Sequence, residues 1–301
     1  MSWMIELTFA ILLTSVTGSI LLLLWYFIGR LLQRSGYLNI QYLLLKIELL
    51  FFVIPVFYLY FTRNSNLVLM KAGGVLFLET PVIRTGSLIF SAVWLSGVIM
   101  ISAIYIFDIV RLYWRNRGKI PCVKEVEECF HAVCKKLNIP QGRVRLYRSY
   151  RIQVPELIGV LHPVVMLPVE DFTPEEMQVI FIHELTHYRQ KDIEIKYLVT
   201  LILVIHFFNP VVWWLHMSIR KWSEFTCDSK ACEPAGGIKK YFEVILKIAT
   251  DRGNIGPFFT ARLTEDAHEI LKRVEYMKKY KAFRKKSPGI IAGICTVLLV
   301  C

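Results

Sequence analysis

A histidine motif and a long apolar run lie close together in this sequence, and together they restrict the topology of the chain. The motif is HELTH, residues 183–187, and the apolar run covers residues 197–217. The run is long enough to cross a bilayer once as a helix. A single crossing would place every later residue on the opposite side of the membrane from the two histidines, so no later residue could share a metal site with them.

The dipeptide Asn209-Pro210 interrupts this run near its middle. Proline lacks a backbone donor and disfavours helix in the residue before it, so the pair marks a break. We therefore predict that residues 197–217 fold back on themselves as a membrane-facing apolar hairpin. A single crossing would also place the basic stretch at 278–286 outside the cell, against the tendency of lysine and arginine to remain in the cytoplasm.

Composition predicts that much of the remaining chain is embedded in a membrane. Hydrophobic residues make up 55% of the 301 residues and charged residues only 20%, which is typical of a chain that is partly embedded. Within residues 1–118 we predict a membrane domain with three transmembrane helices, at 5–29, 40–62 and 87–113. Basic residues follow the first and third predicted helices and are expected to remain in the cytoplasm. The chain is therefore expected to be a multi-pass protein of the cell membrane with its N-terminus outside.

Residues 119–286 have the pattern of a folded cytoplasmic domain. Helical periodicity covers 123–137, alternation at 143–147 predicts a strand, and the proline-punctuated segment 154–168 predicts an edge strand or irregular hairpin. Residues 287–301 are apolar but too short to cross a bilayer. We interpret them as the start of a fourth transmembrane helix, truncated because the sequence is a fragment of a longer protein.

The net charge and the cysteines both have simple explanations. The formal charge of +12 is not gathered on an interleaved basic and aromatic face, so direct nucleic-acid binding is not expected. The basic residues instead lie at predicted membrane borders, where they can attract anionic lipid. The seven cysteines are too irregularly spaced for a zinc knuckle, and we interpret them as small buried side chains in a reducing compartment.

The helix that carries HELTH has a clear start. Thr173 is a suitable N-cap, Pro174 suits the first helical position, and Glu176 completes a capping box. The helix is predicted to run from Pro174 to about Asp192. A regular helix through the motif would place its two histidines on one face.

The motif itself predicts a zinc site. His183 and His187 are four residues apart, so their imidazoles can share one zinc ion. Glu184 projects beside them, in position to polarise a zinc-bound water as general base and later proton donor. These three residues predict a zinc-dependent hydrolase.

A catalytic zinc ion needs a third protein ligand, and the sequence offers several. Glu224 and Asp228 are spaced to lie on one face of a helix, so Glu224 can bind zinc while Asp228 holds a histidine ring by its other nitrogen. Asp192 is a further orienting candidate, with an ordinary exposed helix-end acid as the equal alternative. The remaining candidates are less suited by residue type or by their apolar surroundings: His206, His216, Cys227, Cys232 and His268.

Four stretches together carry a family resemblance. HELTHYRQKD, FNPVVWWLH and EFTCD, preceded by VPELIGVLHPVVMLP, resemble the integral-membrane gluzincins of the BlaR/MecR type. The resemblance implies an α-helical membrane protein with an inserted α+β gluzincin zinc-protease domain, in which an edge β-strand lies above the HExxH helix. It also implies that His183, His187 and Glu224 bind zinc and that Glu184 is catalytic. Relatives often have an acid where this chain has Trp222, two residues before the third ligand.

The resemblance implies a cytoplasm-facing zinc endopeptidase that transduces a signal. On this hypothesis an extracellular signal activates the protease to cut itself and a cytoplasmic transcriptional repressor, and a homodimer is compatible with it. In the antibiotic sensors a penicillin-binding domain reads the signal; because the 301 residues contain no such domain, β-lactam sensing is not carried over. The peptide substrate is expected to pair with the edge strand at Gly159, Val160 and Leu161.

Two other functions stay open at this point. A membrane quality-control or prenyl-protein type of zinc protease shares HExxH and ExxxD, but differs in the number of spans. A non-catalytic membrane sensor or scaffold would keep the fold without turnover, and the intact HExxH and ExxxD motifs argue against it. The donor that would stabilise the oxyanion is not identified by sequence: Tyr241, Arg262 and His268 are candidates, and each is more easily explained as a packing or surface residue.

Overall fold

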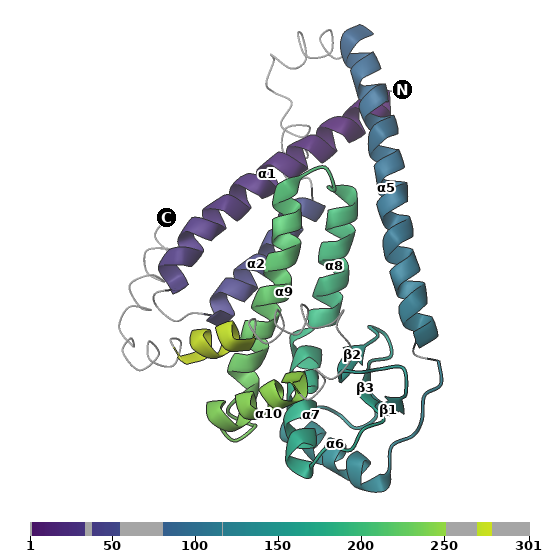
Figure 1. Ribbon diagram of the computed structural model, residues 1–301. Coiled ribbons are helices and arrows are strands. Elements are labelled where there is room, and N and C mark those ends of the chain that lie inside the picture. The colour runs from purple at the N-terminus through teal and green to yellow at the C-terminus, as the bar shows by residue number, and fades with distance from the viewer. Residues whose placement is uncertain (1, 34–37, 55–80, 116, 251–269, 279–301) are drawn as a thin grey trace. The chain divides into compact units, whose positions relative to one another are not determined.

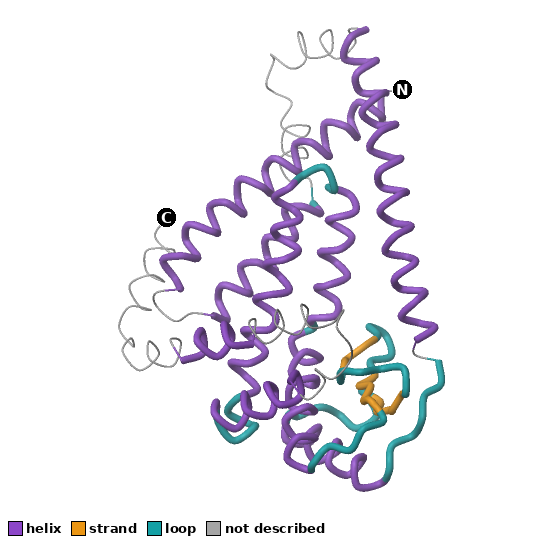
Figure 2. The backbone as a smooth tube through the Cα atoms, viewed as in Figure 1, coloured by secondary structure: helices purple, strands orange, loops and turns teal. Residues whose placement is uncertain are grey.

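The computed structural model describes residues 2–33, 38–54, 81–115, 117–250 and 270–278 (Figure 1). The chain is divided into two compact units. The first, here called the helical unit, comprises Met1–Gly29, Tyr42–Arg111 and Lys196–Arg220. The second, here called the site unit, comprises Arg30–Gln41, Leu112–Ile195 and Lys221–Cys301. Helices dominate the described residues of both units, and the few strands lie in the site unit (Figure 2).

Long apolar helices make up the helical unit. They are α1 (Ser2–Gln33), α2 (Leu38–Val53) and α5 (Pro81–Arg115), joined by most of α8 (Asp192–Ile205) and the first half of α9 (Pro210–Ala231). Among the described residues, two stretches are long and apolar enough to cross a membrane, Glu6–Phe27 and Arg84–Trp114. Large side chains such as Phe27 and Phe107 are exposed along them, which suits contact with lipid rather than water.

The membrane assignments can be compared with these helices only in part. The predicted spans at 5–29 and 87–113 fall within α1 and α5. The predicted span at 40–62 begins in α2 but continues beyond the described residues, and 287–301 lies outside them altogether. The division into three spans and the start of a fourth therefore stays a prediction.

The chain reverses direction between α8 and α9 (Figure 1). α8 ends at Ile205 and α9 begins at Pro210, where the proline predicted a break. Within the helical unit, Asn209 Nδ2 donates hydrogen bonds to the Oγ atoms of Ser15 and Ser19, both at 2.7 Å. Trp94 Nε1 on α5 donates to the Ile205 carbonyl oxygen at 2.8 Å. The turn is thus held by α1 and α5, and its depth relative to a membrane stays a prediction.

A three-stranded mixed sheet and four helices form the core of the site unit. The strands β1 (Arg145–Ser149), β2 (Glu156–Ile158) and β3 (Val164–Pro168) are arranged in the order β1-β3-β2. β3 pairs parallel with β1 and antiparallel with β2, so it is central and fully buried. The helices of this unit are α6 (Lys124–Lys136), α7 (Pro174–Gln190), α10 (Ile238–Thr250) and the second half of α9. α7 packs against α6, α10, β2 and β3.

The residues predicted as the edge strand are partly misplaced. The edge strand within this segment is β2, which ends at Ile158. Gly159, Val160 and Leu161 lie in the loop that joins β2 to β3. Gly159 has a left-handed φ of +84°, and the Leu161 side chain is 88% exposed. A left-handed glycine turns the chain out of the ladder, so pairing stops one residue before the predicted segment begins.

The predicted start of α7 is confirmed. The Thr173 side chain accepts a hydrogen bond from the Glu176 backbone N–H, and the Thr173 N–H donates to Glu176 Oε2 at 2.9 Å. The helix ends slightly earlier than predicted, at Gln190, because Lys191 adopts a left-handed conformation with φ of +57°. α8 then begins directly at Asp192.

Candidate metal centre

The two histidines of HELTH lie close together on α7. His183 Nε2 and His187 Nε2 are 3.2 Å apart, and both side chains are largely buried. Two nitrogens bound to one tetrahedral zinc ion at about 2.0–2.1 Å would lie about 3.3 Å from each other. The spacing of these two ring nitrogens therefore fits a shared metal ion.

The carboxylate of Glu224, the predicted third ligand, lies near the Nε2 atoms of both histidines. Its Oε2 lies 3.8 Å from His183 Nε2 and its Oε1 lies 3.6 Å from His187 Nε2. The carboxylate comes from α9, whereas both histidines come from α7. Its side chain is 33% exposed, so the site is open on the carboxylate side. The structure thus brings together the three residues that sequence spacing predicted as ligands.

The other nitrogen of His187 is held by Asp192. His187 Nδ1 lies 2.7 Å from Asp192 Oδ2, and Asp192 is fully buried. The left-handed turn at Lys191 directs the chain so that the first residue of α8 faces back to α7. Asp192 is therefore not an exposed helix-end acid. A carboxylate at Nδ1 fixes the tautomer that leaves the Nε2 lone pair free for a metal ion.

The other nitrogen of His183 is held differently from the sequence prediction. Asp228 was expected to contact a histidine ring, but Tyr241 lies between them: the Tyr241 hydroxyl is 2.6 Å from His183 Nδ1 and donates to Asp228 Oδ1 at 2.8 Å. Burial, together with the negative charge of Asp228, raises the pKa of Tyr241 well above its ordinary value. The neutral hydroxyl donates its one proton to Asp228 and so accepts from His183 Nδ1–H, which again leaves Nε2 unprotonated.

Arg273 completes the network and was not singled out from sequence. Its Nε donates to Asp228 Oδ2 at 2.7 Å and its Nη2 to Asp228 Oδ1 at 2.6 Å. Its Nη1 lies 3.4 Å from Glu224 Oε2. Arg273 comes from the helical segment 270–278, which no motif in the sequence marks as part of a site.

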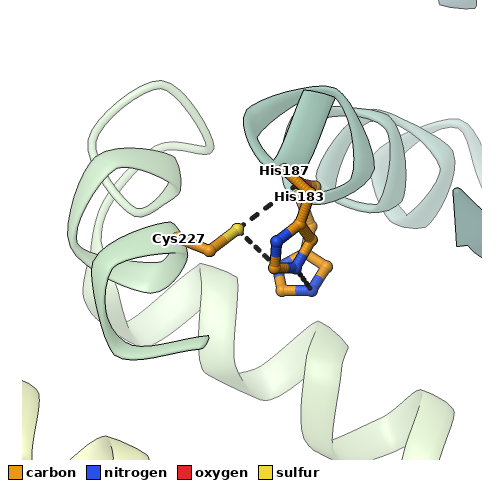
Figure 3. Close-up of side chains that lie close together, drawn as sticks. All are labelled: His183, His187 and Cys227. Atoms are coloured by element: carbon orange, nitrogen blue, oxygen red, sulfur yellow. Dashed lines mark hydrogen bonds between the residues drawn. The ribbon is translucent and has the colours of Figure 1, made fainter. Parts of the chain in front are cut away.

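Cys227 offers a second arrangement of ligands around the same histidines (Figure 3). One potential ligand atom each from His183, His187 and Cys227 lies within 4.8 Å of the others. Cys227 Sγ, however, lies 3.4 Å from His183 Nδ1, the nitrogen that Tyr241 already contacts. Burial raises the pKa of the Cys227 thiol to about 12, and the thiol donates to the His183 carbonyl oxygen. Glu224, which faces both Nε2 atoms, fits a metal ligand better.

The remaining sequence candidates are distributed over the chain. Glu184 lies on α7 between the two histidines and is buried. His206 belongs to the helical unit, where its Nε2 lies 3.2 Å from the Phe52 carbonyl oxygen, and His216 also belongs to that unit. Cys232 is buried just beyond α9, whereas Arg262 and His268 lie outside the described residues. Trp222 packs edge-on against Phe225 and Tyr276.

Two histidines one turn apart, a glutamate between them in sequence, and a glutamate from a second helix define the class of the HExxH metallopeptidases. Comparison with known proteins agrees with this class. The BlaR1 peptidase M56 family matches residues 76–277, more than half of the chain. The chain belongs to this family, and the resemblance inferred from its motifs is confirmed.

Two curated relatives are similar to this chain over more than half of its length. Regulatory protein BlaR1 of Bacillus licheniformis is 29% identical over 189 residues, which are 61% of this chain and 31% of the relative. The methicillin resistance mecR1 protein of Staphylococcus aureus is 24% identical over 182 residues, 55% of this chain and 31% of the relative. The chain thus spans about a third of the length of these relatives. Family membership and the two candidate spans identify a membrane protein, and the donor set fits a metal ion.

Proposed function

We propose that the protein is a membrane-embedded zinc endopeptidase that faces the cytoplasm and transduces a signal. In this proposal an extracellular signal activates it to cleave itself and a cytoplasmic transcriptional repressor. The observation that carries the peptidase part is the convergence of His183 Nε2, His187 Nε2 and the Glu224 carboxylate within 3.2–3.8 Å. The regulatory part is supported by similarity to a relative named as a regulatory protein.

The proposed division of roles follows from the contacts in the site. A zinc ion held by His183, His187 and Glu224 would supply a Lewis acid that lowers the pKa of a water molecule. Asp192 and Tyr241 hold the two rings by their Nδ1 atoms. Both Nε2 atoms therefore keep their lone pairs for the metal ion without any rearrangement of the rings.

Glu184 is proposed as the general base and later the proton donor. It takes a proton from the attacking water and delivers it to the amine of the cleaved peptide bond. Its place on α7 is fixed by the same helix that carries the two ligands, and its side chain is buried. A carboxylate sheltered from bulk water exchanges its proton with the reacting groups rather than with solvent.

The peptide substrate is proposed to lie alongside β2 as an added strand. β2 packs against α7 and is at one end of the described three-stranded sheet, next to β3. A strand added at this end would extend the sheet by main-chain hydrogen bonds. Gly159, Val160 and Leu161 would contact the substrate from the adjoining loop rather than as part of the ladder.

The test is expression of the full chain in cells, followed by purification in detergent. We expect about one zinc ion per chain and a self-cleavage fragment that Glu184→Ala abolishes, since this change removes the proton carrier but no ligand. Glu175→Ala, which changes an exposed acid in the first turn of the same helix, serves as the matched control and should leave the fragment unchanged. A wild-type protein that contains zinc but cuts neither itself nor a co-expressed repressor would contradict the transducer proposal.

A further inference from the structure

We infer that Arg273 is a positioning residue for the metal ligands, holding Glu224 directly and His183 through Asp228 and Tyr241. The inference rests on the proposed metallopeptidase function and adds a residue that lies outside both of its sequence motifs. Arg273 touches no reacting atom in this scheme. It acts on the two helices, α7 and α9, that supply the ligands.

The first contact of Arg273 is a two-pronged pair with Asp228. Two parallel hydrogen bonds, at 2.6 and 2.7 Å, join the guanidinium to both carboxylate oxygens. Such forked, charge-assisted pairs fix orientation as well as distance. Asp228 is fully buried and the Arg273 side chain is only 14% exposed, so removing the cation would leave a buried carboxylate without its charge partner.

The second contact reaches a ligand itself. The third guanidinium nitrogen, Nη1, lies 3.4 Å from Glu224 Oε2, the oxygen that lies 3.8 Å from His183 Nε2. The planar guanidinium therefore uses all three of its nitrogens at once. A lysine ammonium is a single point of charge and cannot span both carboxylates in this way.

The third connection is indirect and leads to His183. Asp228 Oδ1, which Arg273 holds, accepts the hydroxyl proton of Tyr241, and that hydroxyl contacts His183 Nδ1. If Asp228 turned away, the Tyr241 hydroxyl could rotate and donate to Nδ1 instead. The His183 tautomer would then no longer be fixed, and its Nε2 would not be held ready for a metal ion.

The experiment compares zinc affinity in the purified chain of residues 1–301. Metal is removed with a chelator and restored in competition with a chromophoric chelator, and the absorption spectrum with Co²⁺ reports the ligand geometry. We expect Arg273→Gln to bind zinc roughly 10–100-fold more weakly than wild type, as is typical when a partner of a metal ligand is lost. Arg273→Lys should fall between the two, because it restores charge but not the fork.

Two controls separate positioning from general effects. Lys272→Gln removes one positive charge from the neighbouring exposed position on the same helix and should bind zinc as wild type does. The second control is the double variant Arg273→Gln/Asp228→Asn. Its loss of zinc-binding free energy should be smaller than the sum of the losses in the two single variants, because either single change already breaks the contact between Arg273 and Asp228.

The outcomes that reject the inference are distinct from those that reject the function. A folded Arg273→Gln protein with wild-type zinc affinity and an unchanged Co²⁺ spectrum would overturn it. If that variant does not fold, a folded Arg273→Lys protein with wild-type affinity would do the same, and failure of both to fold would assign Arg273 a general structural role instead. A wild-type protein that binds zinc but cleaves nothing would reject the proposed function, while the affinity comparison would still decide the role of Arg273.

Discussion

At the scale of single residues, the Tyr241 hydroxyl has the most demanding position in the site. It is fully buried, accepts from His183 and donates to Asp228. We predict that Tyr241→Phe retains the fold, because the ring keeps its packing, but weakens zinc binding roughly 10-fold or more. Chelator competition on the purified variant measures this directly.

The matched control for this prediction is Tyr150→Phe. That change removes the same hydroxyl from a side chain that is 80% exposed, so zinc affinity should stay at the wild-type value. If Tyr241→Phe and Tyr150→Phe behave alike, the tautomer of His183 does not depend on Tyr241.

The residues of the site differ in how far sequence could predict them. His183, His187 and Glu224 could be found because each belongs to a short motif with helical spacing. Tyr241 and Arg273 come from separate segments, and their approach to Asp228 depends on how those segments pack. No local spacing encodes such contacts. A buried carboxylate such as that of Asp228 requires hydrogen-bonding or charged partners. Which residues provide them is seen only in the folded structure.

At the scale of elements, the turn between α8 and α9 depends on Asn209. The side chain of Asn209 reaches Ser15 and Ser19 on α1 and also accepts a hydrogen bond from Val211 N–H at 2.9 Å. We predict that Asn209→Ala destabilises the protein by about 1 kcal/mol, the usual size of a polar contact between membrane helices. Thermal unfolding in detergent measures the change.

Ser96→Ala provides the comparison for Asn209→Ala. The Ser96 hydroxyl is exposed and bonds only within its own helix, to the Val93 carbonyl oxygen, so its loss should leave the unfolding temperature nearly unchanged. Equal effects of the two substitutions would mean that the hydrogen bonds of the Asn209 side chain do not stabilise the turn.

The boundaries of elements show why local patterns succeed in some places and not in others. The capping box at Thr173 is a local device and appears as predicted. Segment 154–168 contains the hairpin of β2 and β3, but the residues predicted to pair with substrate, 159–161, lie directly after β2. Proline and glycine punctuation marks irregularity without fixing the register. The register of β2 is set by its pairing with β3, in which Leu157 lies opposite Val165, and a tertiary pairing of this kind has no local signal.

At the scale of the whole molecule, the side of the membrane on which the site lies is still a prediction. Lys239 is 92% exposed at the start of α10, so a cysteine placed there in a variant without other cysteines would be accessible to a labelling reagent. We predict that an impermeant thiol reagent labels Lys239→Cys only after the cells are permeabilised. Ser65 lies between the predicted spans 40–62 and 87–113, which an outside N-terminus places outside the cell. Ser65→Cys should therefore be labelled in intact cells. Labelling of Lys239→Cys from outside would reject the cytoplasmic placement.

The reversal between α8 and α9 has a consequence for the connectivity of the chain. From His187 the chain enters the helical unit, turns at Asn209 and returns to the site unit before it reaches Glu224. A metal ion bound by both residues would therefore act as a cross-link that closes this loop. Because such a site does not exist in the unfolded chain, binding of the ion stabilises only the folded form of this loop. The ion that supplies the chemistry would thus also stabilise the turn between α8 and α9, although no residue of that turn binds it.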